Sequence, residues 1–484
     1  MKIYYINNSF DYELDKLTSV FFPNIKTESV KADCDDMIVY EKPYISVKFG
    51  ADSVITVAAE LNDLSDFRSK TIGDNDNAEL EAALLLYDIL KSYTGVTPPW
   101  GVLTGVRPIK LFRKLKEQMG EREAAEHFKN VFCVSAEKVK ITLETEKNES
   151  EILSKTTPKS FSLYLSVPFC PSRCSYCSFV SASTERTKHL VEPYTRLLCE
   201  EIEKTAEIVS ALGLKLESVY MGGGTPTTLS AEQLERVLTK TSECFDMSGC
   251  REFTVEAGRP DTITAEKLFA IKSANVDRIS INPQTLNDAV LKVIGRRHTA
   301  DDFYRSFEDA RKCGFGHINT DLIAGLPADT FSSFKSTLDN ITRLSPESIT
   351  VHTLAMKRAS TLNQNGKKLY DNEADTASQM LTYADTTLHD CGYYPYYLYR
   401  QSRMVGNLEN TGWSKKGMEG YYNVFIMDES QTIIACGAGA VTKITGCGSR
   451  LERIFNFKYP YEYIDRFDEV LKRKEAIKQL YDKS

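Results

Sequence analysis

The sequence lacks the features that would place the protein in a membrane, on an export route or on nucleic acid. No apolar run in the 484 residues approaches the ~20 residues that a membrane-spanning helix needs. The first residues, Met1 to Asn8, do not have the pattern of a signal peptide. The 60 Lys and Arg against 67 Asp and Glu give a net charge of −7, which argues against a general nucleic-acid-binding surface. We therefore expect a soluble cytoplasmic protein with no membrane span and no nucleic-acid partner.

The cysteines do not form the dense framework of a small secreted domain. The chain has 12 cysteines, and all but three of them are scattered along its length. Such a distribution predicts reduced thiols in a cytosol rather than a set of disulfides. The sequence also contains no low-complexity segment and no short internal repeat.

The remaining three cysteines form a motif with the spacing C-x3-C-x2-C, directly after an apolar run over residues 163–167. They are Cys170, Cys174 and Cys177. The apolar run predicts a buried strand, and loops at the carboxyl ends of strands are where α/β folds place their chemistry. Three thiolates on one loop can hold three irons of a cubic iron–sulfur cluster and leave the fourth iron open to a small molecule. A structural zinc site is the alternative, but its nearest fourth ligands, His189 and Cys199, fall in the next predicted helix.

The order of predicted strands and helices indicates an α/β fold in four segments. Residues 1–95 are expected to form a small α+β N-terminal domain, and residues 96–157 a helical connector. The expected elements of the first domain are strands over 2–6, 36–41, 45–49 and 53–60 and a helix over 78–93.

Residues 158–385 carry six apolar runs that alternate with helical stretches, which predicts βαβ units in an open, partial (βα)6 barrel. The runs lie at 163–167, 218–221, 253–256, 278–281, 318–323 and 348–354. Residues 386–484 begin with a tyrosine-rich stretch and are expected to form a C-terminal α/β lid domain that covers a substrate.

Polar or glycine-rich residues follow the predicted barrel strands. The second strand ends in Gly222, Gly223, Gly224 and Thr225, and the backbone N–H groups of such a segment can meet a ligand carboxylate. The third strand ends in Glu256, and a carboxylate there is costly to bury without a partner. The partner is a ligand or, as the structural alternative, Arg259 or Arg278 in a buried ion pair. The later strands add Gln284, Arg296, Asp321 and Ala355 at the same end, which together indicate a bound ligand.

The cysteine loop resembles that of the radical SAM enzymes. In that superfamily S-adenosylmethionine (SAM) chelates the open iron of a [4Fe–4S] cluster, and an electron from the cluster splits SAM to give a 5′-deoxyadenosyl radical. The resemblance implies that Cys170, Cys174 and Cys177 bind the cluster. It also implies that no side chain is catalytic, because the radical of the cofactor does the chemistry.

The order and spacing of the motifs over residues 160–360 resemble the oxygen-independent coproporphyrinogen III oxidase family. In that family the matching positions contact SAM, and a second SAM can bind nearby. The resemblance implies that Tyr164 and Glu256 contact one SAM, with the glycine segment at its methionine end. It implies that Gln284, Arg296, Asp321 and Ala355 contact the other. Tyr176, inside the cysteine loop, is a further expected SAM contact.

The whole chain is similar to the HemZ-type branch of this family, the coproporphyrinogen dehydrogenases. The similarity lies in Trp-Gly-x-Leu-Thr-Gly-Val-Arg-Pro from Trp100, in the tyrosine-rich stretch from Tyr393 and in Gly-Asn-Leu-Glu-Asn from Gly406. It implies a tetrapyrrole substrate, whose flat ring and carboxylates suit aromatic and Arg side chains. The alternative is an ordinary aromatic core with surface cations. The expected partners of the substrate propionates are Arg107, Lys110, Arg400 and Arg403.

The resemblance implies the oxidative decarboxylation of coproporphyrinogen III to protoporphyrinogen IX in haem biosynthesis, with an electron donor such as flavodoxin or ferredoxin. The chain departs from its family at two places. The oxidase has a further cysteine where this chain has Phe179, and the haem-binding chaperone relatives have a His where this chain has Tyr422. A haem-binding carrier that keeps the SAM site and a radical SAM methyltransferase-type enzyme of haem degradation are therefore the alternatives.

Overall fold

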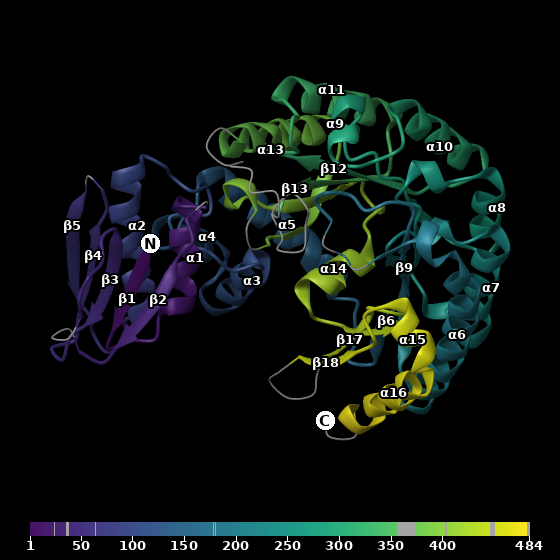
Figure 1. Ribbon diagram of the computed structural model, residues 1–484, viewed down its shortest axis with the longest axis horizontal. Coiled ribbons are helices and arrows are strands. Elements are labelled where there is room, and N and C mark those ends of the chain that lie inside the picture. The colour runs from purple at the N-terminus through teal and green to yellow at the C-terminus, as the bar shows by residue number, and fades with distance from the viewer. Residues whose placement is uncertain are drawn as a thin grey trace. The chain divides into compact units, whose positions relative to one another are not determined.

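A computed structural model describes residues 1–23, 25–34, 38–62, 64–177, 179, 181–355, 373–401, 404–445 and 451–481 (Figure 1). They form two compact units, which are described separately here. The first is built mainly from Met1–Leu143 and Arg400–Glu409, and the second holds most of the chain from Glu144 onward. In these described ranges, no helix is both long enough and apolar enough to cross a bilayer.

The first unit contains a five-stranded sheet with the order β2-β1-β3-β4-β5. Its strands are β1 (Lys2–Ile6), β2 (Glu28–Ala32), β3 (Tyr44–Phe49), β4 (Val54–Glu60) and β5 (Ser65–Thr71). Alternate strand residues such as Ile3, Tyr5 and Val57 are buried in one core with α1 (Asp11–Phe21) and α2 (Ala78–Thr94), since successive side chains of a strand point to opposite faces. The strands predicted over 2–6, 45–49 and 53–60 and the helix predicted over 78–93 are confirmed.

The strand predicted over residues 36–41 is wrong in its described part, because residues 38–41 have no strand structure. The sheet instead uses β2 and β5, which the sequence pattern missed. Both strands lie at the edges of the sheet and are largely exposed, so they carry charged residues in place of an apolar alternation. The chain continues through α3 (Pro108–Met119), α4 (Glu121–Asn130) and α5 (Ala136–Leu153).

The second unit contains six neighbouring parallel strands, as predicted. They are β6 (Ser160–Val167), β9 (Lys215–Gly223), β10 (Glu252–Glu256), β11 (Arg278–Ser280), β12 (Ile318–Ala324) and β13 (Ser348–Thr353). The helices between them are α6 (Thr184–Ala211), α7 (Ala231–Cys244), α8 (Ala265–Ser273), α9 (Asp288–Val293), α10 (Ala300–Lys312) and α11 (Phe331–Leu344). Figure 1 shows these helices along the outside of a curved sheet, so the sheet forms an open barrel.

The two faces of the barrel sheet differ in polarity. In β9, Val219 and Met221 are fully buried apolar residues, whereas Tyr220 between them reaches the neighbouring strand and donates a hydrogen bond to Glu256. The same alternation gives β6 a polar face that includes Ser162, whose hydroxyl lies 2.7 Å from that of Ser218. Because the outer helices bury the apolar face, the polar side chains point into the barrel. The interior is therefore suited to a polar ligand at its open end.

The C-terminal residues extend this sheet at both edges. β15 (Asn410–Ser414) pairs antiparallel with β13, and β14 (Tyr394–Tyr399) pairs with β15. At the other edge β16 (Thr432–Cys436) runs parallel to β6. Further elements of this part of the chain are β17 (Val441–Ile444), β18 (Glu452–Phe455), α13 (Glu373–Asp390), α14 (Tyr421–Asp428), α15 (Pro460–Asp465) and α16 (Phe467–Tyr481). An α/β fold with more than one part is thus confirmed, and the boundaries at 95, 157 and 385 stay a prediction.

Candidate functional site

The three cysteines lie on the loop between β6 and α6, at the carboxyl end of a barrel strand. Cys170 ends the short strand β7 (Phe169–Cys170), and the Cys177 N–H donates to the Cys174 carbonyl over 3.2 Å. All three cysteines are free, and Cys174 is buried. Burial raises the pKa of the Cys177 thiol, so this thiol stays protonated at neutral pH until a bound metal supplies positive charge.

Arg259, in the segment that follows β10, donates hydrogen bonds to the cysteine loop. Its guanidinium donates to the Cys174 sulfur over 3.3 Å and to the Ser172 hydroxyl over 2.9 Å. It also forms an ion pair with Asp261 at 3.1 Å. The alternative role that the sequence gave Arg259, as an ion-pair partner of Glu256, is therefore wrong, because its contacts go to the cysteine loop and to Asp261.

The glycine segment lies directly against the cysteine loop. A Cβ added at Gly224 would stand 2.5 Å from the Phe169 carbonyl oxygen and 3.0 Å from the Cys170 sulfur. Gly223 has φ +115°, a conformation that side chains disfavour. The Thr225 hydroxyl lies 3.5 Å from the Cys170 sulfur. Only a residue without a side chain fits at position 224, so these glycines set the distance between the second strand and the thiols.

Glu256 ends β10 beside the glycine segment. The Tyr220 hydroxyl donates to its carboxylate over 2.5 Å, and a Cβ at Gly222 would stand 3.1 Å from it. Burial raises the pKa of Glu256 to about 7, although the Tyr220 hydrogen bond opposes the rise and the nearby Asp321 adds to it. Arg278, the other cation that the sequence suggested, donates instead to Ser348. Glu256 is thus a half-buried residue, and neither Arg259 nor Arg278 forms an ion pair with its carboxyl.

Three tyrosines stack beside this carboxyl. The rings of Tyr220 and Tyr422 have centroids 4.5 Å apart and are 19° from parallel. Tyr164 from β6 lies 6.0 Å from Tyr422 and 6.3 Å from Tyr220. Burial raises the pKa of the Tyr164 hydroxyl, so the stack is a neutral, flat surface at the inner face of the barrel.

The carboxyl of Glu256 makes the stability of the metal-free protein depend on pH. Its pKa rises from 4.5 to about 7 on folding, so between these values the folded chain holds a proton that the unfolded chain has released. The contribution of Glu256 to the free energy of unfolding is therefore highest below pH 4.5. It falls by about 3 kcal/mol in total as the pH rises from there through 7.

We expect Glu256→Gln to remove this fall, since the amide is never charged. Chemical denaturation of wild type and variant at pH 5 and pH 8 measures the difference. The wild type should lose up to about 3 kcal/mol more than the variant between the two pH values, and equal losses would contradict the burial assigned to Glu256.

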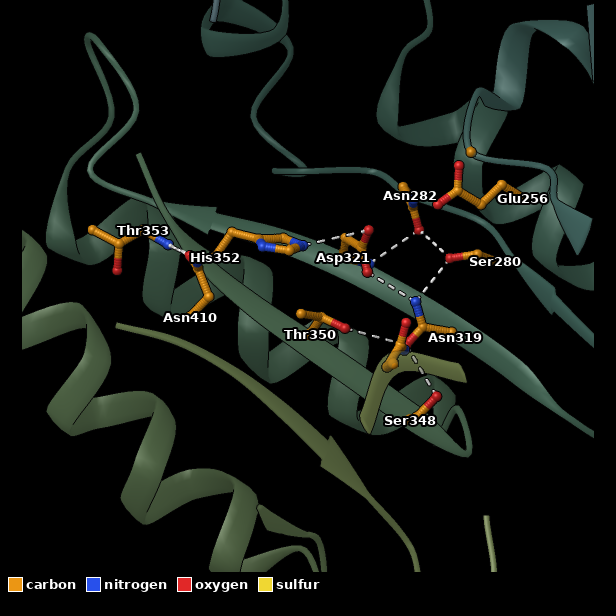
Figure 2. A network of polar contacts seen from close by, with 12 residues as sticks. Glu256, Ser280, Asn282, Asn319, Asp321, Ser348, Thr350, His352, Thr353 and Asn410 are labelled. Carbon is orange, nitrogen blue, oxygen red and sulfur yellow. Dashed lines mark hydrogen bonds and ion pairs between the residues drawn. The ribbon is translucent and has the colours of Figure 1, made fainter. Parts of the chain in front are cut away.

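A network of polar side chains joins β11, β12 and β13 at the same end of the barrel (Figure 2). The Asn319 amide donates to Asp321 and to Ser280, both over 2.8 Å. Asn282 accepts from the Ser280 hydroxyl over 2.8 Å and from the Asp321 N–H over 3.2 Å. His352 lies 3.6 Å from the Asp321 carboxylate. Of these residues only Asp321 was predicted as a site residue from the sequence, although the period-two spacing of polar residues on each strand was a usable signal.

Asp321 and Glu256 differ in charge at neutral pH. Burial alone would raise the pKa of Asp321, but hydrogen bonds from His352 and Asn319 hold that pKa below its usual value. Asp321 is therefore an anion, whereas Glu256 is divided between its neutral and charged forms. The open end of the barrel can attract a cationic group and accept hydrogen bonds from hydroxyls.

Gln284, Arg296 and Tyr176 form a second group of predicted contacts. Gln284 has φ +67°, and its buried Oε1 has no hydrogen-bond partner among the residues described. The Arg296 guanidinium donates to the Tyr176 hydroxyl and to the Gly258 carbonyl, both over 3.0 Å. Ala355 follows β13 and is half-buried. Arg296 and Tyr176 therefore lie against the cysteine loop, while Gln284 pairs with the backbone of β12 at Leu322.

Three of the four side chains predicted to bind the substrate propionates lie in the first unit, and the fourth lies outside the described residues. The Arg400 guanidinium is buried and donates to the Leu103 and Asn407 carbonyls over 2.7 and 3.0 Å, and burial lowers the pKa of Arg400 to about 10. Arg107 is half-buried and Lys110 is exposed. Arg403 lies outside the described residues. Arg400 thus ties two chain segments of its own unit together, and the roles of all four toward a substrate stay predictions.

The residues of the loop fit an iron–sulfur cluster better than a single ion. Among the described residues, no three His, Cys, Asp or Glu side chains converge to hold one metal ion. In a cubic cluster each thiolate binds a different iron, and the loop supplies three free thiols beside glycines whose lack of a side chain permits close approach. The orphaned Gln284 oxygen and the two carboxyls lie at the same end of the barrel, where a polar ligand of the cluster would need them.

The chain is similar to one family model and to several known proteins. The family model described as the radical SAM superfamily matches residues 164–341. The chain is 38% identical over 403 residues to the oxygen-independent coproporphyrinogen-III oxidase-like protein HemZ of Bacillus subtilis, over 82% of this chain and 80% of that protein. It is 33% identical over 290 residues to the heme chaperone HemW of Lactococcus lactis, over 60% of this chain and 71% of the relative.

Among solved structures, the coproporphyrinogen III oxidase HemN of Escherichia coli, described as a radical SAM enzyme, is similar with a TM-score of 0.52. The similarity covers 68% of this chain and 73% of that one at 22% identity. At this identity the structural similarity supports the fold alone.

Proposed function

The chain belongs to the HemZ-type branch of the oxygen-independent coproporphyrinogen III oxidase-like family, within the radical SAM superfamily, and from this premise we propose that it decarboxylates coproporphyrinogen III to protoporphyrinogen IX. Its cofactors are a [4Fe–4S] cluster and SAM. One observation carries the proposal. A cysteine loop, a glycine segment and the carboxyl of Glu256 meet at one barrel end, in a chain 38% identical to a coproporphyrinogen-III oxidase-like protein.

We propose that Cys170, Cys174 and Cys177 each bind one iron of the cluster. The cluster and SAM together supply a 5′-deoxyadenosyl radical, which no side chain can provide. The glycine segment from Gly222 to Thr225 is the proposed contact of the SAM carboxylate, because its backbone lies beside the cysteine loop. The charged form of Glu256 attracts the SAM ammonium, and Tyr164 offers a flat surface next to it.

Gln284, Arg296, Asp321 and Ala355 are the proposed contacts of a second SAM, and Tyr176 is a further proposed SAM contact. Asp321 is anionic, and Oε1 of Gln284 has no hydrogen-bond partner within the described part of the chain, which supports a ligand with ammonium and hydroxyl groups there. Arg107, Lys110, Arg400 and Arg403 remain the proposed partners of the substrate propionates.

The proposed reaction balances without a catalytic acid or base. Conversion of each of two propionates to a vinyl group removes one hydrogen atom, one carbon dioxide and one electron. The cluster and SAM, held beside Cys170, Cys174 and Cys177, would supply the chemistry that accepts the hydrogen atom. An external one-electron acceptor takes that electron. The chain's own task is to hold the propionate near the radical and to exclude water, so that the radical is not lost.

An anaerobic incubation tests the proposal. Reconstituted protein is mixed with SAM, a low-potential one-electron reductant, coproporphyrinogen III and an added one-electron acceptor for the electron that the substrate releases, and the products are separated. We expect protoporphyrinogen IX with two molecules of 5′-deoxyadenosine for each tetrapyrrole converted. Cleavage of SAM that leaves the tetrapyrrole unchanged would contradict the proposed substrate.

A haem-binding carrier is the second candidate. It is favoured by the 33% identity to a heme chaperone and by Phe179, an exposed side chain at the place where the oxidase has a further cysteine. Incubation with haem in place of coproporphyrinogen separates the candidates. Stable haem binding without turnover supports the carrier, and conversion of haem to an open-chain product supports the degradation enzyme.

We also propose that the protein works in a reducing cytoplasm and that a donor such as flavodoxin or ferredoxin supplies its electrons. All eleven cysteines in the described ranges are free, which supports a reducing compartment. A low-potential donor is needed because the cluster must be reduced before SAM is cleaved.

A further inference from the structure

Arg259 is a buried cation that donates one of its hydrogen bonds to a cysteine of the loop. Only 4% of the residue is exposed. One guanidinium nitrogen, Nη1, donates both to the Cys174 sulfur and to the Ser172 carbonyl over 3.3 Å. The other, Nη2, donates to the Ser172 hydroxyl over 2.9 Å and to Asp261 over 3.2 Å. The cation therefore directs an N–H group at the middle thiol of the motif.

The backbone around Arg259 holds this geometry in place. The Thr262 N–H and the Thr262 hydroxyl both donate to the Arg259 carbonyl, over 2.9 and 2.8 Å. The neighbouring Gly258 carbonyl accepts from Arg296, whose other nitrogen donates to Tyr176 inside the cysteine loop. Two arginines thus connect one short segment to the loop, and the position of Arg259 does not depend on a single contact.

Asp261 is the counter-ion of Arg259. Its carboxylate lies 3.1 Å from Nε and 3.2 Å from Nη2 of the guanidinium, a paired geometry that fixes the plane of the cation. Burial alone would raise the pKa of Asp261, but the hydrogen bond and charge of Arg259 hold that pKa below its usual value. Asp261 is therefore anionic and reduces the positive charge that the thiol experiences.

We propose that Arg259 raises the reduction potential of the cluster and that Asp261 limits this rise. The inference rests on the cluster assigned to Cys170, Cys174 and Cys177. Reduction adds one electron and makes the cluster more negative, so an N–H donor and a positive charge at a ligand sulfur stabilise the reduced form. The anion at Asp261 acts in the opposite direction. In this account Arg259 is a positioning and tuning residue, since it touches a cluster ligand but no reacting atom.

Redox titration followed by electron paramagnetic resonance tests this pair without SAM or substrate. The variants are Arg259→Gln and Asp261→Asn, each reconstituted anaerobically with its iron and sulfide content measured. We expect the midpoint potential of Arg259→Gln to move to a more negative value and that of Asp261→Asn to a more positive one. The control is Arg297→Gln, because Arg297 is largely exposed in a surface ion pair with Glu185 and solvent screens its charge. Its potential should match the wild type.

The two shifts of opposite sign distinguish tuning from simple support of the loop. A structural role would lower the iron content of both variants and would not move their potentials in opposite directions. If Arg259→Gln does not hold a cluster, the midpoint potentials of Asp261→Asn and Arg259→Lys test the proposal instead. Because lysine keeps the positive charge, the potential of Arg259→Lys should lie near that of the wild type. The proposal is overturned if the midpoint potential of Asp261→Asn equals that of the wild type or is more negative than it. The redox titration does not depend on turnover. If the protein does not convert coproporphyrinogen III, the proposed substrate is wrong, but the expected potentials stay the same.

Discussion

The variant Cys174→Ala should contain no iron–sulfur cluster and should not cleave SAM. Cys174 is the middle thiol of the loop, is buried, and accepts a hydrogen bond from Arg259. With two thiolates left, the loop cannot hold three irons of a cubic cluster. Iron and sulfide analysis, the brown absorbance of the reconstituted protein and the yield of 5′-deoxyadenosine measure the loss. Each should fall to the background found without protein.

Cys244→Ala is the matched control, because Cys244 is a half-buried free cysteine at the end of α7 and outside the loop. It should keep the wild-type iron content and rate of SAM cleavage. Wild-type iron content and cleavage in Cys174→Ala would show that the cluster lies elsewhere.

A second large effect is expected from Gly224→Ala. The added Cβ would stand 2.5 Å from the Phe169 carbonyl oxygen and 2.9 Å from its carbon. These are backbone atoms of the strand that ends in Cys170, so relief of the clash must move the first thiol. We expect a loss of about 1–3 kcal/mol in the free energy of unfolding, together with a loss of most of the cluster. Chemical denaturation and iron analysis of the same preparation measure both.

Gly316→Ala provides the comparison for this variant. A Cβ at Gly316 meets no atom of the described residues within 4 Å, and the φ of Gly316 is not in the left-handed region. Its stability and iron content should stay close to the wild type. If Gly224→Ala behaves in the same way, the close packing of the glycine segment on the cysteine loop is not what positions the thiols.

The barrel was predictable because its strands are short apolar runs in a regular alternation with helices. The runs at 163–167 and 253–256 lie inside β6 and β10, as expected. Parallel strands align their carboxyl ends, so Gly222, Glu256 and Asp321 could be placed at one end from the sequence. What the sequence could not supply was the pairing of β14 to β18 with the barrel sheet, because a strand pattern does not specify which distant strand becomes its neighbour.

The site was predictable in its motifs but not in the contacts that surround them. Arg259 looked like a possible partner of Glu256, whereas it lies against Cys174. That choice depends on the turn after β10, which the sequence pattern does not determine. Arg400 was expected at a substrate propionate, and its guanidinium instead donates to backbone carbonyls of its own unit. Its role toward a substrate stays a prediction, because buried donors go to whichever acceptors the fold places near them.

In the proposed reaction, a SAM-derived radical removes hydrogen from the propionates of coproporphyrinogen III. The most direct measurement is an anaerobic turnover with substrate that carries deuterium on its propionate side chains, followed by mass spectrometry of the 5′-deoxyadenosine. The account predicts one deuterium atom in each molecule of 5′-deoxyadenosine formed during conversion to protoporphyrinogen IX. Unlabelled 5′-deoxyadenosine, formed while the tetrapyrrole keeps all its carboxylates, would contradict it.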